Sequence, residues 1–170
     1  MRLIITAVLF TGLMISACSP TETLQDEVDE TEEIPGAPSW YDDLRQSYSD
    51  SLSFYGVAMA AASDSAEAAE LSLTEAKENL RFAIDEFVEK VRDSAAEESG
   101  NYNSPEFIIR LRNAVIEMDI SGAESEIEHL EANTLTHHVY SKSVLSRSDA
   151  ADILGNTLDD SAFINRIREY

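Results

Sequence analysis

Residues 64–91 read DSAEAAELSLTEAKENLRFAIDEFVEKV, a stretch that predicts one long amphipathic helix. Asp64 can cap its start, and Glu67 three positions later completes a capping-box pattern. The apolar residues recur every three or four positions, which places them on one helical face. They are Ala66, Ala69, Leu73, Ala76, Leu80, Ala83, Phe87 and Val91, widened by Ile84 and Val88. Because the alanines come first, we expect the start of the helix to lie closer to its neighbour than the end.

The pattern favours a helix that packs on a β-sheet, with coiled-coil pairing as the alternative. The opposite side of the helix is charged, and we expect it to be solvated. Its members are Glu70, Lys77, Glu78, Arg81, Glu86, Glu89 and Lys90.

A strand is expected before this helix, over residues 51–60, which read SLSFYGVAMA. The stretch is short, rich in aromatic and small residues, and bounded by polar clusters. Gly56 in its middle indicates either a bulge or a close approach of another backbone.

The chain after the long helix predicts further helices around a hairpin. Gly100-Asn101 ends the first helix, and Ser104-Pro105-Glu106 begins a second. That second helix is apolar over more than half its circumference, so we expect it to be buried on two sides or to cover a partner. Residues 124–131 predict an exposed or edge strand, and residues 138–145 predict its hairpin partner. Ser146 or Ser148 then caps a helix that Gly155-Asn156 stops, and Asp159 or Asp160 starts the last one.

These elements predict an α+β domain over residues 39–170. We expect a small antiparallel sheet of about three strands packed on the long helix, with further C-terminal helices.

Composition excludes several classes of function. Of the 170 residues, 12 are Lys or Arg and 33 are Asp or Glu, which gives a formal net charge of −21. So acidic a surface repels phosphate backbones, and we expect no nucleic-acid partner. The single cysteine, Cys18, excludes an intramolecular disulfide and a cysteine-rich zinc site.

Residues 1–17 predict a lipoprotein signal peptide. Arg2 is followed by fifteen uncharged residues, too few for a comfortable transmembrane helix. The stretch ends Ile15-Ser16-Ala17-Cys18, which resembles a bacterial lipobox. We therefore expect Cys18 to become the acylated N-terminus and to anchor the protein to a membrane. Ser19, in place of the Asp that retains many lipoproteins at the inner membrane, favours the outer membrane. The alternatives are a secreted protein with a free thiol and a short membrane anchor.

Residues 18–38 predict the acylated cysteine followed by a disordered acidic tether. Residues 19–38 hold seven acidic residues, no basic residue and three of the four prolines of the chain. Calcium capture is an alternative role, although the spacing of a hand-type calcium loop is missing. Trp40, where the tether meets the domain, is expected to be a packing anchor, with a partner hot spot as the alternative.

Four features occur in order along the chain: Pro38-Ser39-Trp40, the YGVAMA of residues 55–60, the helix alanines, and the strand with Val139-Tyr140 before a Ser-capped helix. In these features the chain resembles the LPP-twenty (twenty-kilodalton) outer-membrane lipoprotein family, over roughly residues 38–155. The sequence departs from the family pattern at Ala58, where glycine is usual, and at Ser141, Lys142 and Ser143. The resemblance implies an α+β domain with an envelope role and no activity. Some relatives form outer-membrane disks around the flagellar motor.

The histidines supply the one alternative that involves a metal or ligand. His129 and His138 could meet across the hairpin, joined by Glu131 or Glu126. His137 and His138 point to opposite faces of a strand and cannot easily share an ion. Surface histidines are the simpler interpretation, and we assign no metal ligand or cofactor.

The sequence offers no nucleophile elbow and no glycine-rich phosphate loop, so we assign no catalytic residue and expect no enzyme. We expect a lipid-anchored outer-membrane protein, periplasmic or surface-facing, that binds envelope proteins or its own copies. A structural ring or disk component of the flagellar basal body is the alternative, and a metal- or ligand-binding domain using His129 and His138 is the second.

Overall fold

The computed structural model describes residues 36–133 and 135–170, except for the side chains of residues 131–133. The predicted signal peptide, Cys18 and most of the predicted tether lie outside the described residues. Within those residues, every helix is too short or too polar to cross a membrane.

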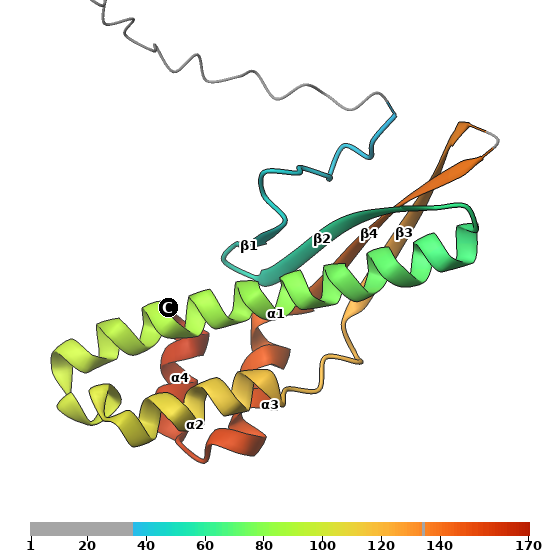
Figure 1. Ribbon diagram of the computed structural model, residues 1–170. Helices are drawn as coiled ribbons and strands as arrows, with labels where there is room; N and C mark the ends of the chain where they lie inside the picture. Colours follow the sequence, from blue (N-terminus) through green and yellow to red (C-terminus); the bar gives the residue numbers. More distant parts are fainter. Residues whose placement is uncertain (1–35, 134) are drawn as a thin grey trace, which may run out of the picture. The chain divides into compact units, whose positions relative to one another are not determined.

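The predicted α+β class is confirmed: one antiparallel sheet packs on a long helix (Figure 1). The strands are β1 (Ser47–Ser49), β2 (Ser53–Ala62), β3 (Glu124–Asn133) and β4 (Thr136–Ser146), in the spatial order β1-β2-β4-β3. Sequence analysis predicts three of these; β1, only three residues long, is the additional strand. The expected hairpin is present, and β3 lies at an edge of the sheet as predicted.

Helix α1 (Ser65–Glu98) covers one face of the sheet and continues well beyond it (Figure 1). Its 34 residues correspond to a length of about 50 Å. Asp64 caps the helix as predicted, because its carboxylate accepts hydrogen bonds from the backbone N–H groups of Ala66 and Glu67. The sheet and the remaining helices bury the apolar stripe from Ala76 to Val91, so this part of it needs no coiled-coil partner.

Small residues let the first half of α1 lie very close to the sheet. Gly56 of β2 sits directly against the turn that contains Ala76 and Leu80. A little further along, the hydroxyls of Ser72 and Ser141 form a buried hydrogen bond of 2.7 Å between α1 and β4. Gly56 thus marks a close backbone approach and not a bulge, because the pairing of β2 with β4 runs without irregularity.

The second half of α1 packs among the other helices, where the larger core residues gather. These helices are η1 (Gly100–Asn103), α2 (Pro105–Ile116), α3 (Arg147–Leu158) and α4 (Ser161–Glu169). Ser104 caps α2 and Asp160 caps α4, both as predicted. The core that they enclose includes Phe87, Val91, Phe107, Leu111, Leu154, Phe163 and Ile167. The predicted change from a narrow gap to a wide one along α1 is confirmed.

The sequence expectations about the start of α1 and the end of α3 are wrong. At the start of α1, Ala68 and Ser72 are buried, while Ala66 is exposed and Ala69 and Leu73 are half-buried. The sheet there is lined by small residues, so the helix turns a row of small side chains toward it. Helix α3 does not stop at Gly155-Asn156 but continues to Leu158, which is buried, and ends at Asp159 in the left-handed conformation (φ 37°).

Candidate functional site

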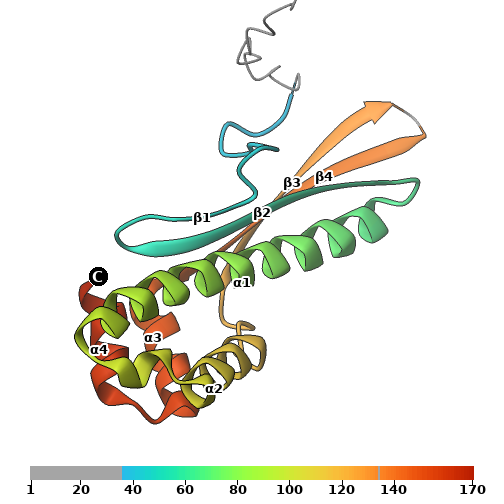
Figure 2. The ribbon, with the colours of Figure 1, turned by 60° about the vertical axis from the view of Figure 1, so that its left-hand side comes forward.

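The chain enters the domain across the sheet face that α1 leaves open. Residues 36–46 run from β3 toward β1, as Figure 2 shows. Trp40 lies over this face: its indole N–H donates to Oε1 of Glu128 at 2.9 Å, and Nζ of Lys142 lies 4.8 Å from its ring centroid. Lys142 also forms an ion pair with Glu126. These contacts tie the entering chain to β3 and β4, which is the anchoring role that the sequence predicts for Trp40.

An aromatic pair continues this covering layer. Tyr41 stands edge-on to Tyr140 of β4, with ring centroids 4.8 Å apart. Burial raises the pKa of both phenols. The Tyr140 hydroxyl is buried and has no hydrogen-bond partner among the described residues. Trp40 and Tyr41 therefore cover the middle of β4 on this face of the sheet.

The sheet register separates the two histidines of the metal hypothesis. His129 of β3 pairs with Val139, and His138 of β4 pairs with Leu130. Since side chains alternate along a strand, His129 points to the face that α1 covers and His138 to the other. His129 instead lies 3.1 Å from the Ser65 hydroxyl at the start of α1. No group of three or more His, Cys, Asp or Glu side chains in the described part of the chain could hold an ion.

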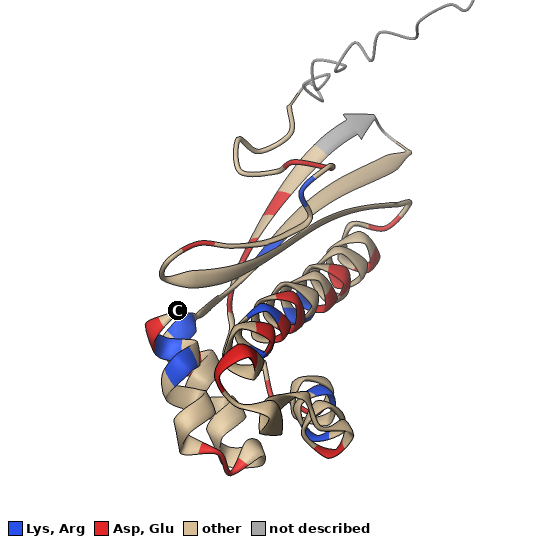
Figure 3. Ribbon diagram, turned by 90° about the vertical axis from the view of Figure 1, so that its left-hand side faces the viewer, with Lys and Arg blue, Asp and Glu red and all other residues tan. Residues whose placement is uncertain are grey.

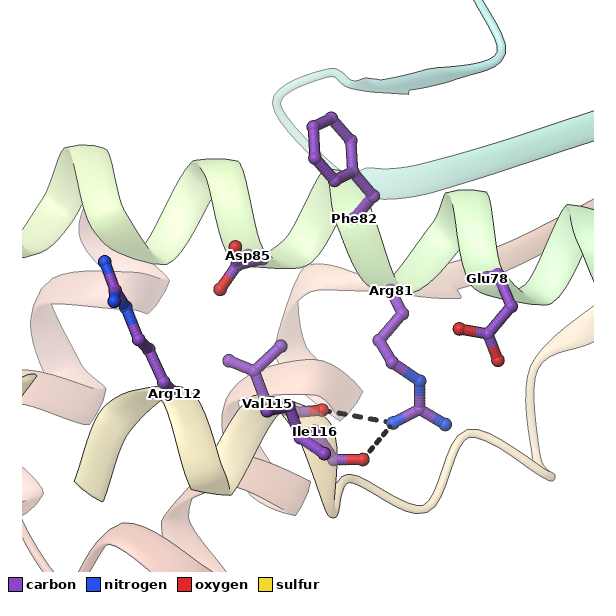
Figure 4. A pocket seen from close by; sticks show the side chains of 7 residues that line it. All are labelled: Glu78, Arg81, Phe82, Asp85, Arg112, Val115 and Ile116. Carbon is purple, nitrogen blue, oxygen red and sulfur yellow. Dashed lines mark hydrogen bonds between the residues drawn. The ribbon is translucent and has the colours of Figure 1, made fainter. Parts of the chain in front are cut away.

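A groove with apolar walls lies between α1 and α2 (Figure 4). Its volume is about 280 Å³, near the lower end for small-molecule sites. Phe82 of α1 and Ile116 of α2 form its apolar walls, and their exposed fractions of 54% and 68% show that they remain open to solvent.

Arg81 holds the two sides of this groove together. Its Nη1 donates to the carbonyl oxygens of Val115 (3.1 Å), Ile116 (2.8 Å) and Met118 (2.9 Å), the first two drawn in Figure 4. Val115 and Ile116 are the last residues of α2 and Met118 lies just beyond it, where the helix dipole favours a positive charge. The Val115 carbonyl also accepts from the backbone N–H groups of Glu117 and Met118. The expectation that Arg81 belongs to a freely solvated helix face is therefore wrong.

Charged groups close the other end of the groove. Partial burial raises the pKa of Asp85, the charge of Glu89 raises it further, and Arg112 lowers it. Glu89 itself accepts from Arg92 at 2.7 Å and from Arg112 at 3.4 Å, so it too departs from the freely solvated face expected of it. Among the described residues Asp85 forms no ion pair, so the groove has a partly buried carboxylate beside its apolar walls, with the charge of Arg112 nearby.

Helix α2 presents apolar residues outward as well as inward. Its inner face, with Phe107, Leu111 and Val115, is buried as predicted. On its outer face, Ile109 is 59% exposed and Ile116 is 68% exposed, so burial on two sides is wrong. Of the two expectations for this helix, the one that remains is that it covers a partner.

Arg81 is the residue that sequence reasoning missed. Nothing in the local sequence marks it, because the carbonyls it binds are about 35 positions further along the chain. Cys18, the one residue to which the sequence assigns a modification, lies outside the described residues. No protein-family model, curated protein or solved structure matches the chain. The resemblance to the LPP-twenty type stays a prediction.

Proposed function

We propose that this chain is a lipoprotein of the bacterial outer membrane whose folded domain binds envelope proteins and catalyses no reaction. The observation that carries the proposal is the stretch Ile15-Ser16-Ala17-Cys18. The only cysteine of the chain comes at the end of an uncharged apolar stretch of signal-peptide length, after two small residues. Acylation of that thiol would bury enough methylene groups to hold the protein stably at a membrane.

The segment after Cys18 supports the same proposal. Residues 19–38 carry seven acidic and no basic residues, a composition that keeps a chain extended and suits a spacer. The spacer would end where Pro38 is buried and Trp40 is tied to the sheet. Such a junction holds the domain at a defined point of the tether.

Exposed apolar side chains support the binding role. Phe82 of α1 and Ile116 of α2 line the same groove, and Ile109 lies two turns before Ile116 on α2; all three expose more than half of their surface. Large exposed apolar side chains that lie together are typical of protein–protein contact surfaces. The net charge of −21 disfavours anionic lipid headgroups and nucleic acids as the bound species.

Membrane fractionation of cells that make the Cys18→Ala variant tests the proposal. We expect the wild-type protein and a Ser19→Ala control in the outer-membrane fraction, and the Cys18→Ala protein absent from it. Circular dichroism of each purified protein verifies that the domain is folded. If the Cys18→Ala protein still fractionates with the outer membrane, the lipoprotein assignment is wrong.

A further inference from the structure

Strand β2 has an open edge over its last residues. On one side it pairs with β4 along its whole length, from Ser53 to Ala62. On the other side it pairs with β1 only as far as Gly56, and one further bond runs from the N–H of Val57 to the carbonyl of Gln46 at 2.8 Å. Figure 2 shows β2 continuing past β1 toward the start of α1.

The hydrogen-bonding groups of this edge follow from the register. Val57 points its N–H toward β1, so by alternation Met59 and Ala61 point their N–H and C=O groups the same way. The chain that would continue β1 turns away instead, with a bond from the N–H of Arg45 to the carbonyl of Asp42. Among the described residues, these edge groups of Met59 and Ala61 have no hydrogen-bond partner.

A side chain of α1 satisfies the edge carbonyl of Val57, whereas the edge after Val57 stays unpaired. Asn79 of α1 donates from Nδ2 to the carbonyl oxygen of Val57 at 2.8 Å, which satisfies the first exposed acceptor. Past that point the edge borders a groove of about 840 Å³ between β2 and α1, lined by Met59, Ala60 and the half-exposed Leu71. Natural proteins usually cover or charge such edges, because an unpaired strand edge accepts another strand.

The far wall of the groove is strongly acidic. Glu67, Glu70, Glu75 and Glu78 of α1 all line it, and none of the four forms an ion pair with another described residue. Figure 3 shows Asp and Glu recurring along α1, with Lys and Arg between them. Four uncompensated carboxylates beside an apolar strip favour a ligand that brings positive charges and apolar side chains together.

We propose that an extended segment of a partner protein, with Lys or Arg at alternate positions, adds to the sheet beside Met59 and Ala61. The segment would pair its backbone with these edge groups and direct its basic side chains toward the glutamates of α1. This inference rests on the proposed binding role of the domain and names the chemistry of the partner. It does not depend on lipid attachment.

Charge selects this occupant over two others. A second copy paired through the same edge would bring two sets of the four glutamates together, and like charges repel. Residues 19–38 of the chain itself carry seven acidic and no basic residues, so they are repelled as well. A basic extended segment is the occupant whose charge complements the groove.

Fluorescence anisotropy with the full chain in mild detergent tests the proposal. The probe is a labelled nine-residue peptide that alternates lysine and valine. Two matched peptides accompany it: one with glutamate in place of lysine, and one with the lysines kept but its edge-facing backbone amides N-methylated. We expect the first to bind, the second not to bind, and the third to bind about tenfold more weakly because it lacks the amide donors.

Variants of the chain locate the site. Ala61→Pro removes an edge N–H where proline is sterically tolerated, and we expect about tenfold weaker binding of the lysine–valine peptide. The double variant Glu70→Gln/Glu75→Gln should bind it several-fold more weakly at low salt, whereas a Glu86→Gln/Glu97→Gln control of equal charge should not. Circular dichroism verifies that each variant is folded.

Three outcomes of the peptide assay would overturn the inference, and one outcome of light scattering would as well. The lysine–valine peptide fails to bind; it binds Ala61→Pro as well as the wild type; or the N-methylated peptide binds equally well, which indicates ionic adsorption. Dimers that dissociate in Ala61→Pro, measured by light scattering, would also overturn it and assign the edge to a second copy. Because Cys18→Ala alters membrane fractionation and Ala61→Pro alters peptide binding, failure of one proposal is distinguishable from failure of the other.

Discussion

Gly56 of β2 lies so close to α1 that a Cβ atom at its position would stand 2.1 Å from the carbonyl oxygen of Ala76. The same Cβ would stand 2.1 Å from the backbone nitrogen of Leu80. Both neighbours are backbone atoms of a helix that is held at both ends, so neither can move aside as a flexible side chain would. This contact sets the distance between the helix and the sheet.

We therefore expect Gly56→Ala to destabilise the domain by about 3 kcal/mol or more, at the upper end for overpacking. Gly122→Ala is the control, because a Cβ there meets no atom within 4 Å. Urea unfolding followed by circular dichroism measures both variants. A Gly56→Ala protein as stable as Gly122→Ala would show that the helix does not approach the sheet this closely.

The buried hydroxyl pair of Ser72 and Ser141 should behave as a coupled unit. Ser72→Ala leaves the Ser141 hydroxyl without its partner in α1, and Ser141→Ala leaves the Ser72 hydroxyl without its partner in β4. We expect each change to lower the free energy of unfolding by about 1–2 kcal/mol. The double variant removes both groups and should cost less than the sum of the single changes. A double-mutant cycle from urea unfolding measures the coupling, and strict additivity would contradict a direct bond.

Arg81 should stabilise the end of α2 more than an exposed charge would. Arg81→Met keeps much of the aliphatic stem but removes the donor to three carbonyls, and we expect a loss of about 1–2 kcal/mol. Amide hydrogen exchange should accelerate first in the last turn of α2. Lys90→Met, an exposed change on the same helix, is the control, and equal effects of the two would argue against the capping role.

Asp85 should destabilise the fold at neutral pH. Its pKa is raised in the folded state, chiefly by burial, so the protonated form is favoured there. Protonated Asp85 therefore stabilises the fold below the pKa that Asp85 has in the unfolded chain, and this stabilisation is lost as pH rises through its pKa in the folded protein. Asp85→Asn should therefore be more stable than the wild type at pH 7, with the difference shrinking toward about pH 4 and below.

Two further variants separate this effect from the general relief of negative charge. Glu86→Gln removes an equal charge from an exposed position on α1 and should stabilise less at pH 7. The pKa shift of Asp50 is opposite to that of Asp85, because hydrogen bonds from the N–H groups of Leu52 and Ser53 lower the pKa of Asp50. The ionised Asp50 therefore stabilises the fold above its unfolded pKa, and this stabilisation is lost as pH falls through its folded pKa. Asp50→Asn should thus be less stable than the wild type at pH 7. Identical pH profiles for Asp85→Asn and Glu86→Gln would contradict the prediction.

Local signals explain why the helix starts could be predicted from the sequence. Asp64, Ser104 and Asp160 each cap a helix by accepting from an N–H two or three residues later, so the information is contained in one turn. The recurrence of apolar residues every three or four positions likewise predicted which face of α1 is buried in its second half. The side chains there are bulky, so only one face of the helix can pack against the core.

Tertiary contacts explain what could not be predicted. Strand β1 is three residues with no apolar alternation, and only its pairing with β2 defines it. Ser72 is buried where a hydropathy pattern selects Leu73, because its partner is a serine on a strand 69 residues away. Arg81 and the open edge of β2 are likewise invisible in the sequence, since each depends on where a distant segment ends.

The intact mass of the protein, made in a bacterium with lipoprotein-processing machinery and purified from its membranes, tests the central claim most directly. We predict a chain that begins at Cys18, heavier than its amino-acid sequence by a diacylglyceryl group and a further acyl chain. Fragmentation should place the added mass on Cys18. A mass that matches an unmodified chain, whether it still contains residues 1–17 or has been cut elsewhere and keeps a free thiol, would contradict the account.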